Sequence, residues 1–246
     1  MVPMRHVSWL ASLIWSVVTA GAAACGRVGF DRDVLQIDGL PLFESRCGQA
    51  TLLAPITITN TSDTDLAIDA IATGGFVIET ALPLTIGAGD TVQLDVRAPA
   101  AVIGTDVPGT VKTGTLTMTA GDVVREIPLA STVVGASIAI TDEMGGPLSL
   151  DFITEGCPTP VSARLVNTGT TTARIMFTTS AVELAGFSSG DVGPSDTVVF
   201  TIRPLSGSSC NGAFQVIYTA TGDVCDAVPV TLPGTFSING SSSCSC

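Results

Sequence analysis

The chain has 246 residues, of which 10 are Lys or Arg and 22 are Asp or Glu, so its formal net charge is −12. This balance argues against nucleic-acid binding, because phosphate groups require clustered Lys and Arg side chains. Only 13% of the residues are charged and 46% are hydrophobic, which argues against a long disordered tail. The length allows one large domain or two ordinary ones.

The first residues have the order of an export signal. Residues 1–6 are short and basic through Arg5, residues 7–19 form a mostly apolar run, and a stretch of small residues ends before Cys25. Residues 22–25 read Ala-Ala-Ala-Cys, which resembles the lipobox of bacterial lipoproteins. The resemblance implies that residues 1–24 are removed and that Cys25 is acylated. Ordinary cleavage, which leaves Cys25 as a plain thiol, is the alternative.

Cysteine parity and the residue after Cys25 refine this prediction. The chain has seven Cys, and acylation of Cys25 leaves six for disulfide pairing in an oxidising compartment. Gly26 stands where retention in the inner membrane of enteric bacteria usually needs Asp. The lipoprotein resemblance therefore implies the outer membrane or the cell surface, with the lipid bilayer as a partner of Cys25.

Removal of the signal also removes the only histidine, His6, and both Trp residues. The remaining chain has no imidazole, which excludes Ser-His-Asp and Cys-His catalysis, His-ligated zinc and histidine general bases. We therefore predict a protein that is not an enzyme and that has no cofactor.

The rest of the chain alternates between apolar and polar residues with the period of a β-strand. Residues 91–97, 114–119 and 197–203 each place Val, Leu, Ile, Met or Phe at every second position. Gly, Asp and Pro interrupt such runs every 8–12 residues, and no helical periodicity extends beyond a turn or two after residue 30. This pattern is typical of an antiparallel β-sandwich.

The two halves of this region repeat one another, with six short segments in the same order. The paired segments are 56–61 and 163–168, 75–76 and 186–187, 90–92 and 196–198, 97–99 and 203–204, 120–122 and 221–223, and 127–129 and 228–230. An ordered repeat of this kind indicates tandem domains.

We therefore predict an all-β chain of two tandem immunoglobulin-like antiparallel β-sandwiches, at residues 35–134 and 135–238. Each is about 100 residues long, the size of one seven-strand sandwich. The predicted signal peptide at residues 1–24 and an anchor linker at residues 25–34 precede them, and a Cys-containing tail at residues 239–246 follows.

The repeated turns resemble those of one bacterial family. A strand ending in Asn-Thr-Ser (60–62) or Asn-Thr-Gly (167–169), then Gly-Phe, then an Asp-Thr-Val strand that closes on Pro, is similar to the choice-of-anchor D group. These are bacterial surface relatives of the ASPM-SPD2-Hydin (ASH) immunoglobulin-like folds. The resemblance implies a non-enzymatic, secreted or anchored module and supplies no catalytic residues.

The alternation also identifies the residues that should fill the two cores. In the first sandwich they are Ile56, Ile58, Leu66, Ile68, Phe76, Val92, Leu94, Val96, Leu116 and Met118. In the second they are Ala163, Leu165, Ile175, Phe177, Phe187, Val198, Phe200, Ile202, Phe214, Val216 and Tyr218.

Three patterns in the sequence are candidates for chemical sites. Residues 186–190 match Gly-x-Ser-x-Gly, but this nucleophile elbow needs a following helix and a His, so we predict a loop. Two small acidic groups lack the spacing of a calcium loop and are predicted to be solvated, with a weak calcium site as the alternative. A Cys-x-Cys tail lacks further metal ligands. The residues concerned are Asp31, Asp33, Asp38, Asp63, Asp65, Cys244 and Cys246.

The cysteines are predicted to form disulfides. Cys157 and Cys210 precede the second and sixth strands of the second sandwich, which start at the same end. Cys225 lies at the opposite end, about 20 Å from Cys210, which exceeds the Cα limit of about 7 Å. We therefore predict a Cys157–Cys210 disulfide.

Cys47 is placed at the start of the second strand of the first sandwich, at the end that faces the second. Cys225, beside the turn between the last two strands of the second sandwich, faces it across the junction. The two thiols would then lock the sandwiches into a rod. Pairing of either one with Cys244 or Cys246 of the tail is the alternative.

Together these features predict a non-enzymatic, exported, lipid-anchored surface scaffold, adhesion or interaction module, with another envelope or surface protein as partner. The alternative is a periplasmic binding or chaperone-like subunit that captures a partner strand at a sheet edge. A long, flat edge strand free of charge and Pro would favour the alternative.

Overall fold

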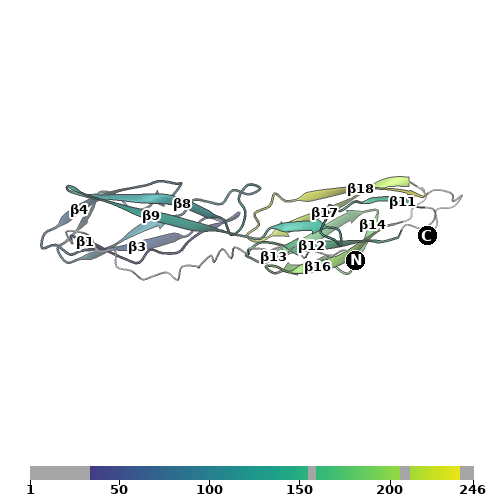
Figure 1. The fold of residues 1–246 in the computed structure, drawn as a ribbon, viewed down its shortest axis with the longest axis horizontal. Helices are drawn as coiled ribbons and strands as arrows, with labels where there is room; N and C mark the ends of the chain where they lie inside the picture. Colours follow the sequence, from purple (N-terminus) through teal and green to yellow (C-terminus); the bar gives the residue numbers. More distant parts are fainter. Residues whose placement is uncertain (1–33, 155–158, 206–210, 239–246) are drawn as a thin grey trace, which may run out of the picture.

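The computed structural model describes residues 34–154, 159–205 and 211–238. Within these ranges the chain is all-β, as predicted, and has no helix. A membrane-crossing helix is accordingly not found among them. Figure 1 shows two β-sandwiches that lie end to end along the long axis of the molecule.

The first sandwich consists of a four-stranded and a five-stranded sheet. Neighbouring strands are antiparallel, except that β2 and β9 are parallel. The four-stranded sheet has the order β1 (Leu35–Asp38), β3 (Leu53–Asn60), β7 (Thr91–Arg97), β5 (Val77–Ile78). The five-stranded sheet has the order β2 (Phe43–Arg46), β9 (Val123–Val134), β8 (Val111–Ala120), β4 (Leu66–Ala72), β6 (Leu84–Ile86).

The second sandwich repeats this arrangement, with β11 and β18 as its parallel pair. Its four-stranded sheet has the order β10 (Ile138–Thr141), β12 (Val161–Asn167), β16 (Thr197–Pro204), β14 (Val182–Ala185). Its five-stranded sheet has the order β11 (Asp151–Thr154), β18 (Val230–Ile238), β17 (Asn211–Thr221), β13 (Ala173–Ser180), β15 (Ser189–Val192).

Each sandwich has its own apolar core, and every predicted core residue belongs to it. Most are fully buried, while Leu66, Val92, Phe177, Phe187 and Val198 are partly buried and pack against the same clusters. The prediction omitted core residues from short strands at sheet edges, where too few residues alternate to show a period. These include Leu35, Ile37, Phe43, Ile86, Ile138, Phe152 and Val182.

The recurring asparagines explain why the two halves share the Asn-Thr turn. The Asn60 side chain is fully buried, and its Nδ2 donates to the carbonyl oxygens of Thr64, Ile86 and Gly87 at 2.8–3.0 Å. Its Oδ1 accepts from the N–H and hydroxyl of Ser62. Asn167 repeats this role, because its Nδ2 donates to the carbonyls of Thr171 and Val192. The Asn therefore ties one strand end to two separate loops.

The two repeats differ at the turn before their last strand. In the first sandwich the two residues Gly121 and Asp122 join β8 to β9, whereas residues 222–229 join β17 to β18. The sequence match of 127–129 with 228–230 is therefore wrong, since Pro128 lies inside β9 while Pro229 precedes β18. The longer loop carries Cys225 to the junction between the sandwiches.

The first strand of the first sandwich is divided between its two sheets. β1 pairs with residues 57–60 of β3, and β2 pairs with residues 131–134 of β9, so residues 39–42 cross from one sheet to the other. This crossing leaves residues 53–56 of β3 and residues 123–130 of β9 without a strand partner on that side, within the described part of the chain.

Candidate binding groove

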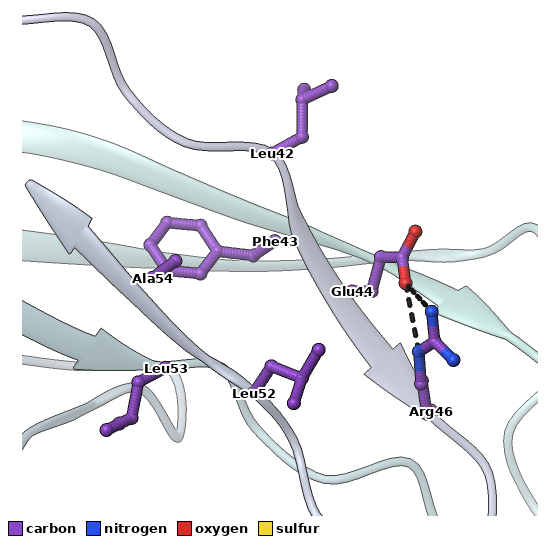
Figure 2. Close-up of a pocket in the computed structure, with 7 residues that line it drawn as sticks. All are labelled: Leu42, Phe43, Glu44, Arg46, Leu52, Leu53 and Ala54. Carbon is purple, nitrogen blue, oxygen red and sulfur yellow. Dashed lines mark hydrogen bonds and ion pairs between the residues drawn. The ribbon is translucent and has the colours of Figure 1, made fainter.

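A groove of about 220 Å³ lies where the chain crosses between the sheets of the first sandwich. Figure 2 shows β2 passing alongside the start of β3, with the Phe43 ring pointing toward Ala54 and the Leu52 side chain lying between the two segments. Its lining is apolar except at one end, where Glu44 and Arg46 form an ion pair.

The leucines of the groove are unusually exposed. Leu42 is 87% exposed, Leu52 72% and Leu53 51%, and Leu40 beside them is 40% exposed. Single exposed apolar residues are ordinary, but a group that lines one hollow marks a surface that excludes water when a partner covers it. The groove is therefore the best candidate for a binding site among the described residues.

Backbone groups at the start of β3 face the same side. The Asn60 N–H donates to the Asp90 carbonyl at 2.9 Å on the β7 side. Because successive residues of a strand alternate in direction, Leu53 and Pro55 direct their backbone groups away from β7. That side has no strand partner in the described residues, so the N–H and C=O of Leu53 and the C=O of Pro55 are available to an added segment.

The charged end of the groove is tied to the second sandwich. Arg46 donates from Nε and Nη2 to Glu44 Oε2 at 3.0 and 2.8 Å, and from Nη1 to Asp223 Oδ2 at 3.4 Å. The hydrogen bond and charge of Glu44, and more weakly the charge of Asp223, raise the pKa of Arg46. Arg46 therefore stays charged and links the groove wall to the neighbouring sandwich.

Cys47, the next residue, forms a disulfide with Cys225. Both are almost completely buried and form a small apolar cluster with Val133 and Ala101. The structure thus selects the bridge across the junction, which the sequence left open beside pairing with the tail. One detail of the prediction is wrong: Cys47 follows the edge strand β2 instead of starting the next strand, because the first strand is split.

One backbone hydrogen bond also crosses this junction, and two others hold the 222–229 loop beside it. The Gly104 N–H donates to the Cys225 carbonyl at 2.6 Å, and the Ala136 N–H donates to the Asp223 carbonyl at 2.6 Å. The Cys225 N–H donates in turn to the Ala136 carbonyl at 2.9 Å. The sandwiches are thus joined by a disulfide, an ion pair and the Gly104–Cys225 hydrogen bond, and not only by the covalent link at residues 135–137, while the two bonds of Ala136 hold the 222–229 loop within the second sandwich.

Comparison with known proteins leaves the family open. No family model and no curated sequence matches the chain. A Porphyromonas gingivalis protein of unknown function is 13% identical with a TM-score of 0.35, covering 83% of this chain and 100% of its own. The periplasmic chaperone SfaE is 13% identical with a TM-score of 0.30, covering 78% and 98%.

The YadV chaperone is 14% identical with a TM-score of 0.27, covering 81% of this chain and 99% of its own. These TM-scores lie below 0.5, so the fold assignment rests on the strand pairing of this chain alone. The resemblance to the choice-of-anchor D group stays a prediction.

Several residues singled out in the sequence lie outside the described ranges. They include Cys25 and the pair Cys157 and Cys210, so lipidation and the second disulfide stay predictions. Residues 186–188 connect β14 to β15, and Ser189 and Gly190 are the first residues of β15, so the segment is a strand–turn–strand arrangement without the helix of a nucleophile elbow. Among the described residues no group of three or more His, Cys, Asp or Glu is placed to hold a metal ion.

The groove was not predicted from the sequence, although the sequence carries a signal for it. Leu40, Leu42, Leu52 and Leu53 lie outside the alternating runs that predict the strands. Pro41 and Pro55 stand among them, and Pro is typical of strand edges. Leucine next to Pro outside the alternating runs is the pattern that would have pointed to an open apolar edge.

Proposed function

We propose that the chain is a non-enzymatic binding subunit that captures an extended, apolar segment of another protein in the groove between β2 and β3. The observation that carries the proposal is the group of exposed leucines, Leu42, Leu52 and Leu53, beside the unpaired backbone at the start of β3. Capture at a sheet edge draws affinity from main-chain hydrogen bonds and specificity from pockets for alternate side chains. The groove offers both.

The occupant should be neutral or basic as well as apolar. The chain carries a net charge of −12, and the two charged residues that line the groove in the described part of the chain, Glu44 and Arg46, neutralise each other. An acidic segment would therefore meet the field of an acidic protein without a compensating contact. The partner chemistry that fits is an extended strand with an apolar residue at every second position and Lys or Arg beside it.

The other open strand edges are less suited to this role. The Val133 N–H donates to the Thr110 carbonyl on the β8 side of β9. Because successive residues of a strand alternate in direction, the backbone groups of Glu126 and Pro128 point to the other side, which is the open edge of β9. In the second sandwich the Thr235 N–H donates to the Leu150 carbonyl on the β11 side of β18. Pro233, two residues earlier, points to the same side, at a part of β18 that β11 does not reach. Proline offers no N–H and a charged residue resists burial, and both are used to blunt sheet edges. The open edge of β3 also carries Pro55, so the feature that distinguishes it is the groove of exposed leucines beside it.

We also propose that the chain is exported and anchored through an acylated Cys25 to a bacterial outer membrane or cell surface. The buried Cys47–Cys225 disulfide supports export, because structural disulfides persist in oxidising compartments. The lipobox-like residues 22–25 support the anchor.

A random dodecapeptide library displayed on phage and selected on the purified chain tests the capture proposal. Selected peptides should alternate apolar residues and should bind Leu52→Asp at least about tenfold more weakly, a loss of about 1.4 kcal/mol. Ile71→Asp is the matched control, because Ile71 is also exposed, at 67%, but lies on β4 away from the groove. N-methylation of alternate peptide nitrogens should weaken binding as well.

Equal binding to wild type, Leu52→Asp and Ile71→Asp would overturn the proposal. Failure to select any peptide would overturn it too. Protection of the Leu53 amide from hydrogen exchange in the complex would support the strand-addition geometry specifically.

A second candidate function is a rigid surface scaffold or adhesion spacer, and the junction favours it. The Cys47–Cys225 disulfide, the Arg46–Asp223 ion pair and the Gly104–Cys225 hydrogen bond join the sandwiches, which lie end to end (Figure 1). Small-angle X-ray scattering should give one extended shape for the wild type. A broad range of shapes would contradict a spacer while leaving the groove untouched.

A further inference from the structure

The loop at residues 222–229 of the second sandwich holds the wall of the groove in the first. Two of its residues contact two successive residues at the end of β2: Asp223 accepts from Arg46 at 3.4 Å, and Cys225 is bonded to Cys47. Arg46 itself lines the groove. The attachment therefore acts on the groove wall directly.

β2 is a short strand at the edge of its sheet. It has four residues, and in the described part of the chain its one strand neighbour is β9, with which it pairs at residues 131–134. Short edge strands with few backbone bonds belong to the least stable part of a fold and open first. An anchor at the C-terminal end of β2 limits that opening.

The loop itself is built to make the attachment. The Asp223 carbonyl accepts from Ala136 N–H at 2.6 Å and from Thr171 Oγ1 at 3.3 Å, so the backbone beneath the carboxylate is fixed. The corresponding turn of the first sandwich consists of Gly121 and Asp122 alone. The two repeats differ in loop length at the place where the second contacts the first.

We infer that Asp223 and Cys225 are positioning residues for the groove, so that the occupancy of the groove and the integrity of the interdomain attachment are linked. The inference rests on the proposed function. Linkage is reciprocal: an attachment that holds β2 in its binding geometry strengthens binding, and a bound segment stabilises the attachment by the same factor. The second sandwich would thereby control the affinity of a site that lies in the first.

The binding arm of the test uses the full chain and a peptide selected as above. The double variant Cys47→Ala with Cys225→Ala, which leaves no unpaired thiol at the junction, should bind about tenfold more weakly. Asp223→Ala should weaken binding in the same direction by a smaller factor. Asp122→Ala is the matched control, since Asp122 occupies the short turn of the first sandwich, and its affinity should equal that of the wild type.

A second control separates positioning from stability. Phe236→Leu alters the core of the second sandwich near the far end of β18 and should lower the melting temperature without changing peptide affinity. Equal affinities for wild type and the double cysteine variant, with both folded by circular dichroism, would overturn the inference. An equal loss of affinity in Phe236→Leu would overturn it as well.

Hydrogen exchange without peptide gives an answer independent of the proposed function. Amides of residues 43–46 should exchange at least about tenfold faster in the double cysteine variant, while those of β7 should keep their wild-type rates. Unchanged exchange at residues 43–46 would show that the attachment does not hold β2. Faster exchange together with no peptide binding by the wild type would keep the mechanical link and refute the groove as a binding site.

Discussion

Replacement of Asn60 by Ala should destabilise the first sandwich strongly although it removes only a small side chain. Asn60 is fully buried, and its amide joins the end of β3 to two loops. Alanine would leave the carbonyls of Ile86 and Gly87 without this donor and the Ser62 N–H without its acceptor. Buried polar groups that lose their partner carry the full cost of desolvation.

The magnitude follows from the number of hydrogen bonds. The Nδ2 group has two hydrogens to share among three carbonyls, so it donates two hydrogen bonds at any moment, and Oδ1 accepts two more. The Ala variant therefore loses four hydrogen bonds. At a net value of about 1 kcal/mol for each, the loss is about 3–4 kcal/mol. A small domain has a total stability of about 5–15 kcal/mol, so the variant loses a large share of it.

Urea denaturation followed by circular dichroism measures this loss. Thr59→Ala is the matched control, because the adjacent Thr59 bonds only Thr91 near the surface, and its effect should stay within about 0.5 kcal/mol. Asn167→Ala should affect the unfolding of the second sandwich in the same way, since Asn167 is its counterpart. An Asn60→Ala variant within about 1 kcal/mol of the wild type would refute the reasoning.

Three further predictions concern other parts of the chain. Burial, and secondarily the charge of Asp226, raise the pKa of Tyr218 to about 12, so its contribution to folding is complete below the unfolded pKa near 10 and is lost as the pH rises toward 12. The wild type should lose at most about 2 kcal/mol more than Tyr218→Phe over that range, and because the chain has one Tyr, tyrosinate absorbance should report a midpoint near 12 rather than 10. A palmitate analogue should label wild type but not Cys25→Ala in a bacterial host, and equal labelling would exclude acylation at this site. Residues 34–134, made alone with Cys47→Ala, should give β-type circular dichroism and a cooperative melt, since this part has its own core; a non-cooperative melt would place the domain boundary elsewhere.

Alternation in the sequence was sufficient to predict the fold class and the interior. Ile56 and Ile58 face the core because side chains of a strand alternate between its two faces, a property of the local backbone that needs no knowledge of the partner strand. The same reasoning identified Phe200 and Ile202. Short edge strands such as β2 escaped it, because four residues carry no measurable period.

The sequence by itself determined that the described chain folds as all-β sandwiches, which residues fill them, and that Cys47 and Cys225 were candidates to meet at the junction. Only the tertiary structure decided between that pairing and the tail, because the choice depends on where the 222–229 loop ends in space. The tertiary structure also determines that the groove exists. Leu42 and Leu52 are ten positions apart, and they line one hollow because the first strand leaves one sheet and joins the other, a matter of strand pairing that local periodicity does not encode.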